Sequence, residues 1–186
     1  EEITEDGAPF GGKEFVCWNP PLLDPARAVR RSAASEATYL LGELASADIR
    51  SLAFARTRRQ VELMYLHLRE RLKESRPELV DRVRPYRAGY LAEDRRQIER
   101  ELFEGRLVAA IATTALELGI DIGELEATVL AGYPGSISST WQQAGRSGRR
   151  GKTSLSILVA SDNPLDQYLM RHPERLFGRD FELALI

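Results

Sequence analysis

Several residue types are scarce in this sequence of 186 residues, and each scarcity excludes a class of site. Cys17 is the only cysteine, and His67 and His172 are the only histidines. Neither a disulfide framework nor a Cys/His zinc site can therefore be built within the chain. We expect Cys17 to be a small buried hydrophobic residue, and neither histidine to bind a metal or act in catalysis.

Long apolar runs are also missing, because the longest ones span only a few residues. This excludes a membrane-spanning helix, which needs about 20 apolar residues. The first residues, 1–6, are acidic and lack the apolar core of a signal peptide. We therefore expect a cytoplasmic protein without a membrane partner.

Net positive charge is missing as well. The formal net charge is −2, so any binding of nucleic acid must come from local basic patches. Lysine is rare, with only Lys13, Lys73 and Lys152, and the other basic residues are arginines. We attribute this bias to genomic base composition, so it does not indicate which arginines matter. Hydrophobic residues at 43% and charged residues at 29% are typical of one globular domain.

Short apolar segments alternate with segments of helical periodicity along the chain. Strands are predicted at 15–18, 51–55, 83–87, 108–112, 128–131 and 155–160. Helices are predicted at 30–46, after Thr57, around Ile98 and Leu102, and at 114–118, 138–147 and 164–171. This order predicts an α/β fold with a mainly parallel sheet and helices on both faces. Ligands of such sheets lie at the carboxyl ends of strands, so the loops at 55–58, 87–92, 112–115 and 132–138 are the informative ones.

Two segments imitate a phosphate-binding P-loop. Gly7 to Lys13 has the spacing G-x-x-x-x-G-K, but Glu14 replaces the required Ser or Thr and a strand follows where a helix is needed. The segment 151–153 lies between a helix and a strand, which is the reverse order. We reject both. Without a Walker A lysine or a DExH-type box, the chain cannot be a complete P-loop NTPase.

Glycines and arginines alternate between residues 141 and 151. An arginine held in a glycine-bearing turn presents a planar fork of donors that matches phosphate oxygens. Arg146 and Arg149 are three residues apart, so on a helical turn both would face one anion. A solvated basic loop is the alternative interpretation of this segment.

Four segments together resemble the motifs of superfamily-2 helicases. Residues 112–122 look like motif V, 142–149 like motif VI and 54–58 like motif IV, while 86–90 resemble the glycine-bearing turn between motifs IV and V. They occur in family order and spacing. Short stretches such as 86–91, 115–123, 130–135, 141–146 and 166–169 are most similar to MrfA/YprA-type bacterial DNA-repair helicases, which are relatives of RecQ-like crosslink-repair helicases.

The resemblance implies a second, C-terminal RecA-like lobe, which is a three-layer domain of the P-loop NTPase type. It would span residues 14–179, after a flexible lead-in at 1–13 and before a tail at 180–186 that leads to a missing downstream region. ATP with Mg²⁺ would bind mainly to a first RecA-like lobe, absent here. The full-length protein would be a 3′→5′ helicase acting on single-stranded DNA, in the bacterial cytoplasm near the nucleoid. This fragment alone would be inactive.

The resemblance also implies roles at the nucleotide. Arg149 would be the arginine finger and Arg146 its companion on the γ-phosphate, where charge develops in the transition state. Gln142 would sense the γ-phosphate. Asp121 would accept a hydrogen bond from the ribose, with Gly119 leaving room for it. A turn aspartate that caps backbone amides is the alternative for Asp121.

A second set of residues would contact DNA. Thr113 and Thr114 begin a helix at a strand end, where free amides and hydroxyls suit a phosphate. Gly89 would let the backbone approach closely, and Thr57 with Arg58 would add a phosphate contact. Thr57 is also expected to be a plain N-cap. Such binding would be salt-sensitive and nearly independent of base sequence.

Other readings of the chain stay open. Arg87 is a weaker DNA candidate, and Trp141 is expected to pack beneath the arginine-bearing helix rather than stack on a base. The lobe could instead belong to a double-strand translocase or an RNA helicase. A non-catalytic nucleic-acid-binding or protein-binding adaptor with a helicase fold is a further alternative.

Overall fold

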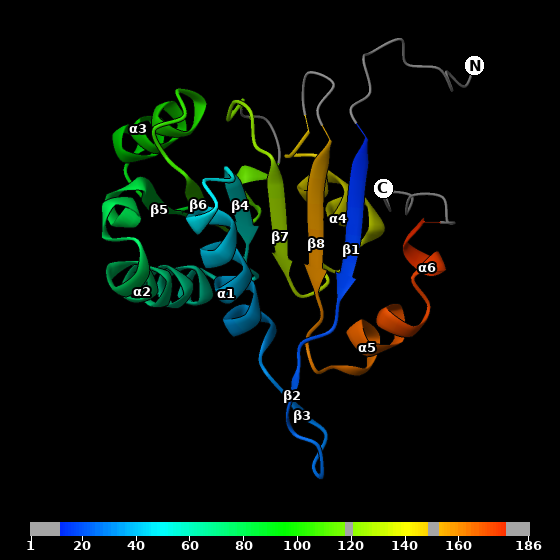
Figure 1. Cartoon of the computed structure of the whole chain (residues 1–186). Coiled ribbons are helices and arrows are strands. Elements are labelled where there is room, and N and C mark those ends of the chain that lie inside the picture. The colour runs from blue at the N-terminus through cyan, green and yellow to red at the C-terminus, as the bar shows by residue number, and fades with distance from the viewer. Residues whose placement is uncertain (1–11, 118–120, 149–152, 178–186) are drawn as a thin grey trace, which may run out of the picture.

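A single parallel sheet organises the chain. The computed structural model describes residues 12–117, 121–148 and 153–177. The strands of the sheet are β1 (Lys13–Trp18), β4 (Ser51–Phe54), β5 (Val83–Tyr86), β6 (Ala109–Ala112), β7 (Ala127–Ala131) and β8 (Ser154–Val159). Their order across the sheet is β1-β8-β7-β4-β6-β5, and every neighbouring pair is parallel (Figure 1). The predicted parallel α/β architecture is confirmed.

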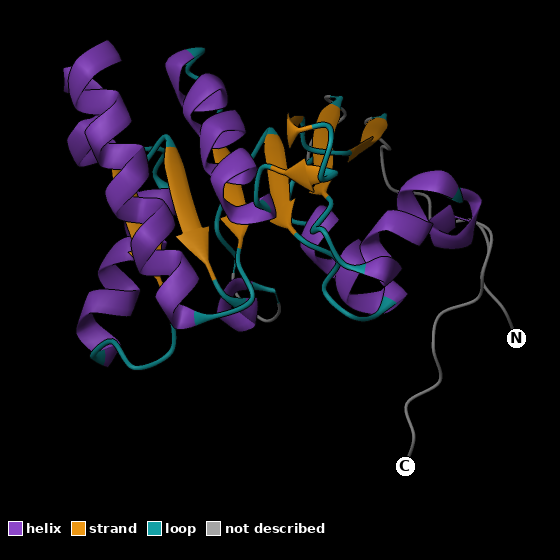
Figure 2. Cartoon of the chain, turned by 90° about the horizontal axis from the view of Figure 1, so that it is seen from below, coloured by secondary structure: helices purple, strands orange, loops and turns teal. Residues whose placement is uncertain are grey.

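Helices cover both faces of the sheet (Figure 2). One face packs against α1 (Ala33–Ser46), α2 (Arg58–Ser75) and the 3₁₀ helix η1 (Pro77–Arg82). The other packs against α3 (Ala92–Phe103), α4 (Ile137–Ala144), α5 (Pro164–Arg171) and α6 (Glu174–Phe177). Every residue of the central strands β4, β6 and β7 is consequently buried. This explains why these strands are continuous apolar runs rather than alternating ones.

The strand register aligns the carboxyl ends of the central strands. Phe54 at the end of β4 pairs with Ala112 at the end of β6 and with Leu130 of β7. Tyr86 at the end of β5 also pairs with Ala112. The loops that leave these strands therefore begin at one edge of the sheet, where ligands of open α/β sheets bind.

Most predicted boundaries agree with the structure. Thr57 is an N-cap whose Oγ1 accepts a hydrogen bond from the Gln60 amide at 3.1 Å. Asn163 caps α5 in the same way, with its side-chain oxygen 2.9 Å from the Asp166 amide. One helix begins later than the predicted residue 30. Ser32 caps it, because the residues before it form a short antiparallel hairpin of β2 (Leu22–Asp24) and β3 (Val29–Arg30).

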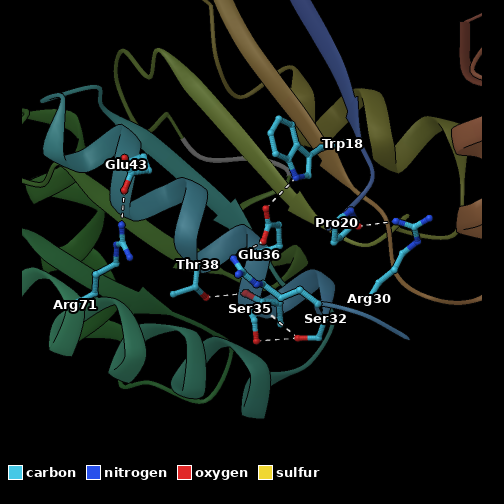
Figure 3. A network of polar contacts seen from close by, with 11 residues as sticks. Trp18, Pro20, Arg30, Ser32, Ser35, Glu36, Thr38, Glu43 and Arg71 are labelled. Carbon is cyan, nitrogen blue, oxygen red and sulfur yellow. Dashed lines mark hydrogen bonds and ion pairs between the residues drawn. The ribbon is translucent and has the colours of Figure 1, made fainter. Parts of the chain in front are cut away.

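A buried glutamate fixes the base of this hairpin, which extends beyond the carboxyl ends of the sheet (Figure 1). Glu36 of α1 is only 2% exposed. Its carboxylate accepts hydrogen bonds from Trp18 Nε1 at 3.0 Å and from Arg31 Nη1 at 2.9 Å. Arg30 Nη1 also donates to the Pro20 carbonyl at 2.7 Å (Figure 3). The segment before β2 and the segment after β3 are thus each bonded to Glu36 of α1, and they are also bonded to each other.

The scarce residues occupy ordinary positions. Cys17 is half-buried rather than fully buried, and burial raises the pKa of its thiol. His67 is exposed on α2, and His172 lies beside Glu174, with 3.3 Å between Nδ1 and Oε1. Within the three described ranges, no three His, Cys, Asp or Glu side chains converge as metal ligands would. No helix in those ranges has both the length and the apolar character to cross a bilayer.

A second buried carboxylate joins two loops at the carboxyl edge. Asp166 is 2% exposed, and its Oδ2 accepts hydrogen bonds from the Ser161 amide at 2.7 Å and the Tyr133 amide at 3.1 Å. Asn163 Nδ2 donates to its Oδ1 at 3.0 Å. Because Ser161 follows β8 and Tyr133 follows β7, this one side chain fixes the path of the chain into α4.

We predict that Asp166→Ala destabilises the domain. The change leaves the buried Tyr133 amide and the half-buried Ser161 amide without an acceptor, and the loss of an acceptor costs a buried donor about 1–3 kcal/mol. Urea denaturation should therefore show a free energy of unfolding lower by about 2–4 kcal/mol. The exposed neighbour Asp162 is the control, since its replacement by alanine should change this free energy by less than about 0.5 kcal/mol. Equal effects of the two variants would contradict the assignment.

We also predict a tyrosine contribution to alkaline unfolding. The fully buried Tyr86 donates its hydroxyl to Glu99 Oε1 at 2.6 Å. Burial, together with this bond, raises its pKa to about 12, compared with about 10 in an unfolded chain. The folded state therefore favours the neutral phenol. Its stabilisation is complete below about pH 10 and is lost as the pH rises toward 12.

The measurement is the free energy of unfolding of the wild type and of Tyr86→Phe between pH 8 and pH 12. The difference between the two proteins should be constant below about pH 10 and should shrink above it. Tyr90, whose pKa is also raised to about 12, stays in both proteins and cancels. A difference that does not change with pH would contradict the prediction.

Candidate functional site

The predicted DNA-contacting residues lie at the ends of three neighbouring strands. Thr57 and Arg58 follow β4, Gly89 follows β5, and Thr113 and Thr114 follow β6. Since β4, β6 and β5 are adjacent in the sheet with their carboxyl ends in register, these residues share one edge. All of them are exposed except Thr113, which is half-buried. Their contact with DNA stays a prediction.

Gly89 has a backbone conformation that favours glycine, with φ of +106°. A Cβ at this position would lie 3.3 Å from Arg87 Nη1 and 3.7 Å from Arg58 Nη1. Two guanidinium groups therefore lie close to a segment of backbone that has no side chain.

The two arginines differ in their partners. Arg87 Nε donates to Glu62 Oε1 at 2.6 Å, and its guanidinium lies 4.6 Å from the centre of the Tyr90 ring. No ion pair of Arg58 occurs among the described residues, and its side chain faces solvent. Arg58 is therefore the better placed of the two to bind a phosphate.

A hollow opens at the same edge, between the ends of β4, β6 and β7. Arg56, Thr114 and Gln143 contribute polar groups to its wall. These residues come from the segments that resemble motifs IV, V and VI. The fold therefore brings the three motif segments to one surface.

The end of α4 differs from the predicted helix at 138–147, which is wrong at its carboxyl end. The α-helix ends at Ala144, and a tighter turn follows, in which the Arg146 amide binds the Gln143 carbonyl at 3.2 Å. At the end of the helix, whose C-cap is Gly145, Lys13 donates its ammonium group to the carbonyls of Ala144 and Ser147. Arg146 therefore lies on this turn rather than on the helix.

The structure also shows the positions of Gly148 and Lys13, which belong to the two glycine-rich segments of the sequence. Gly148 has φ of +90°, and a Cβ there would clash with Ser154 Oγ, so this position requires glycine. Lys13, the lysine of the rejected P-loop pattern, begins β1. Because it binds helix carbonyls, its ammonium group already has partners, and burial lowers its pKa.

Glu117 connects the turn after β6 to α4 and to Arg146. It follows the 3₁₀ turn η2 (Thr114–Leu116) and is 7% exposed. Its carboxylate accepts hydrogen bonds from Ser139 Oγ at 2.6 Å and from Gln143 Nε2 at 2.9 Å. Its backbone carbonyl accepts from Arg146 Nε at 2.9 Å and Nη2 at 2.5 Å. We call these four residues the Glu117 cluster.

Sequence reasoning missed this cluster. A single acidic residue in the apolar stretch 115–118 and two polar residues four apart in α4 were the available signals. Neither shows that these side chains meet, because the two segments are separated by more than twenty residues. The resemblance pointed instead to Gln142, which is exposed on α4.

Of the remaining nucleotide-binding candidates, the structure describes Asp121 but not Gly119 or Arg149. Asp121 is exposed, and its Oδ1 accepts a hydrogen bond from the Gly123 amide at 3.1 Å, which is the turn role given above as its alternative. Its contact with a ribose stays a prediction. Gly119 and Arg149 lie outside the described residues.

Trp141 packs as expected. Its ring lies 5.7 Å from that of Phe15 and 5.8 Å from that of Phe177, measured between ring centres. Its Nε1 donates to the Leu176 carbonyl at 3.4 Å. This aromatic cluster joins α4 to β1 and α6, so the packing of the Trp141 ring holds α4 in place.

Comparison with known proteins agrees with this geometry. Residues 35–151 match the protein family described as helicase conserved C-terminal domain. The chain is 46% identical over 184 residues to the ATP-dependent helicase YprA of Bacillus subtilis, covering 99% of this chain and 24% of YprA. It is 47% identical over 175 residues to the ATP-dependent helicase HRQ1 of Saccharomyces cerevisiae, covering 94% of this chain and 16% of HRQ1.

A solved structure is similar over the same extent. The DUF1998 helicase MrfA bound to DNA and AMPPNP superposes with a TM-score of 0.90 at 46% identity, covering 98% of this chain and 25% of MrfA. This chain thus spans about a quarter or less of each of these relatives. It belongs to the family of helicase conserved C-terminal domains, and its fold is that of the RecA-like C-terminal lobe of such helicases.

Proposed function

We propose that this chain is the second motor lobe of an ATP-dependent 3′→5′ helicase that acts on single-stranded DNA in DNA repair. The observation that carries the proposal is the shared edge of β4, β6 and β5, where Thr57, Arg58, Gly89, Thr113 and Thr114 lie together. Relatives supply the context. YprA and HRQ1 are named ATP-dependent helicases, and MrfA has been solved with DNA and AMPPNP.

The edge has the chemistry of a phosphate track. It offers the guanidinium of Arg58 beside the bare backbone of Gly89, and threonine hydroxyls at two turn starts. None of these groups reads a base by its shape or its hydrogen-bonding pattern. A strand bound here would be held by its sugar-phosphate backbone, as translocation along any sequence requires.

The proposed nucleotide contacts centre on the turn after α4, which carries Arg146. Arg146 is held by the Glu117 carbonyl, and a fixed guanidinium stabilises developing charge without reorganising during the reaction. Arg149, which enters the proposal from its sequence position alone, would be the finger on the γ-phosphate, with Gln142 and Asp121 contacting the same nucleotide. Mg²⁺ and the attacking water would be held by the first lobe.

Two alternatives remain testable against this proposal. A double-strand translocase or RNA helicase lobe would use the same edge, and would differ in whether duplex DNA, RNA or single-stranded DNA stimulates hydrolysis. A non-catalytic adaptor would bind nucleic acid without hydrolysis. The arginine-bearing turn favours a catalytic lobe, because Arg146 is built into the hydrogen-bonded Glu117 cluster.

The first test is ATP hydrolysis by the full-length protein, with and without single-stranded DNA. DNA should stimulate hydrolysis, and Arg149→Ala should lower the stimulated kcat by about 10³-fold or more while ATP still binds. Arg100→Ala, which removes an exposed arginine of α3, is the control and should retain wild-type activity. If neither DNA nor the Arg149→Ala change alters the rate of hydrolysis, the proposal is wrong and the lobe is a non-catalytic adaptor.

The second test concerns the DNA track. Arg58→Ala in the full-length protein should weaken binding of single-stranded DNA to a similar extent for all sequences. It should also make the slope of log affinity against log salt shallower by about 0.7, the value for one phosphate contact on a single strand. The Arg100→Ala control should leave the slope unchanged. A normal slope in Arg58→Ala would remove Arg58 from the track.

A further inference from the structure

Glu117 belongs structurally to the turn that carries the proposed DNA contacts. Its amide donates to the Thr114 carbonyl at 2.9 Å and closes η2. Thr113 begins the same turn as its N-cap, and its Oγ1 accepts from the Ala115 amide at 3.4 Å. The position of Glu117 is therefore set by the same few hydrogen bonds that set Thr113 and Thr114.

The partners of Glu117 lie on the segment that carries the proposed nucleotide contacts. Ser139 and Gln143 are four residues apart, on one face of α4, and both donate to its carboxylate. Arg146, on the turn that follows, donates two N–H groups to its carbonyl. The side chain of one residue thus holds the helix, and its backbone holds the arginine.

Because the Glu117 cluster is buried, breaking only some of its hydrogen bonds is unfavourable. Gln143 is 3% exposed and Glu117 7% exposed, and a carboxylate removed from water needs its hydrogen-bond donors. If η2 shifts, α4 must shift with it or leave the carboxylate without its donors. The Arg146 turn must shift too, or lose its bonds to the Glu117 carbonyl. The cluster is therefore a physical connection between η2 and the segment that carries Arg146.

We propose that Glu117 is a positioning residue that couples DNA contact at Thr113 and Thr114 to the placement of Arg146 on the nucleotide. This inference rests on the proposed function and names a residue through which DNA stimulates hydrolysis. It requires that loss of the Glu117 carboxylate lowers the stimulation by DNA more than it lowers hydrolysis without DNA. Loss of a residue with a purely structural role would lower both rates alike.

The test uses the full-length protein with Glu117→Ala and Glu117→Gln, and ATP hydrolysis measured with and without saturating single-stranded DNA. Glu117→Ala should reduce the ratio of the two rates by about tenfold, within the usual range of coupling between sites. Glu117→Gln should retain most of the ratio, because its amide can bind Ser139 and, once the Gln143 amide turns over, Gln143 as well. Glu104→Ala, at an exposed position after α3, should leave the ratio unchanged.

Ser139→Ala is the second variant, and decides the question if Glu117→Ala does not fold. It removes one donor to the carboxylate and should lower the ratio by about threefold, the effect expected from the loss of a single hydrogen bond. An unchanged ratio in Ser139→Ala and in any folded Glu117→Ala would overturn the inference. A different result would contradict the proposed function, namely that DNA does not stimulate ATP hydrolysis by the wild-type protein.

Discussion

The arrangement of this lobe depends on one constraint, the parallel pairing of all six strands of its sheet. Parallel neighbours must be joined by a crossover that returns the chain to the same starting edge. Every strand therefore ends at the opposite edge, and the segments that leave β4, β5 and β6 begin side by side although they are far apart in the sequence. Because helices cover both faces, this edge and the flanks of the helices remain available for ligands.

The sheet does not determine the paths of the loops and of the hairpin, and buried carboxylates hold these segments in position. Glu36 holds the base of the β2–β3 hairpin, Asp166 joins the loops after β7 and β8, and Glu117 joins η2 to α4. Each accepts at least two hydrogen bonds from segments that are distant in sequence or belong to different elements. A charge that has been removed from water tolerates few geometries, which makes such residues efficient determinants of loop position.

The sequence predicted the parts of the fold that local chemistry determines. Apolar runs located the strands, and the capping roles of Thr57 and Asn163 follow from the types of those residues. The carboxyl end of α4 was predicted wrongly, and the carbonyls there are bonded to Lys13, which lies more than 130 residues away in the chain. The Glu117 cluster was missed because its members meet only in three dimensions. Residues of the candidate site were named from a resemblance, and the structure places the proposed DNA-contacting set on one edge without testing the contacts themselves.

The pairing of β1 with β8 bears on where the folding unit ends. These strands pair along their full lengths, from Lys13 with Ser154 to Trp18 with Val159, whereas the family match covers only residues 35–151. A chain trimmed to the matched region would lose both strands and leave β7 as an open edge of apolar residues, which invites association between copies. It would also lose Lys13, and with it the hydrogen bonds to the carbonyls of Ala144 and Ser147 at the end of α4. The sheet of this lobe thus extends beyond the region by which its family is recognised, and its first strand supplies contacts to the turn that bears Arg146.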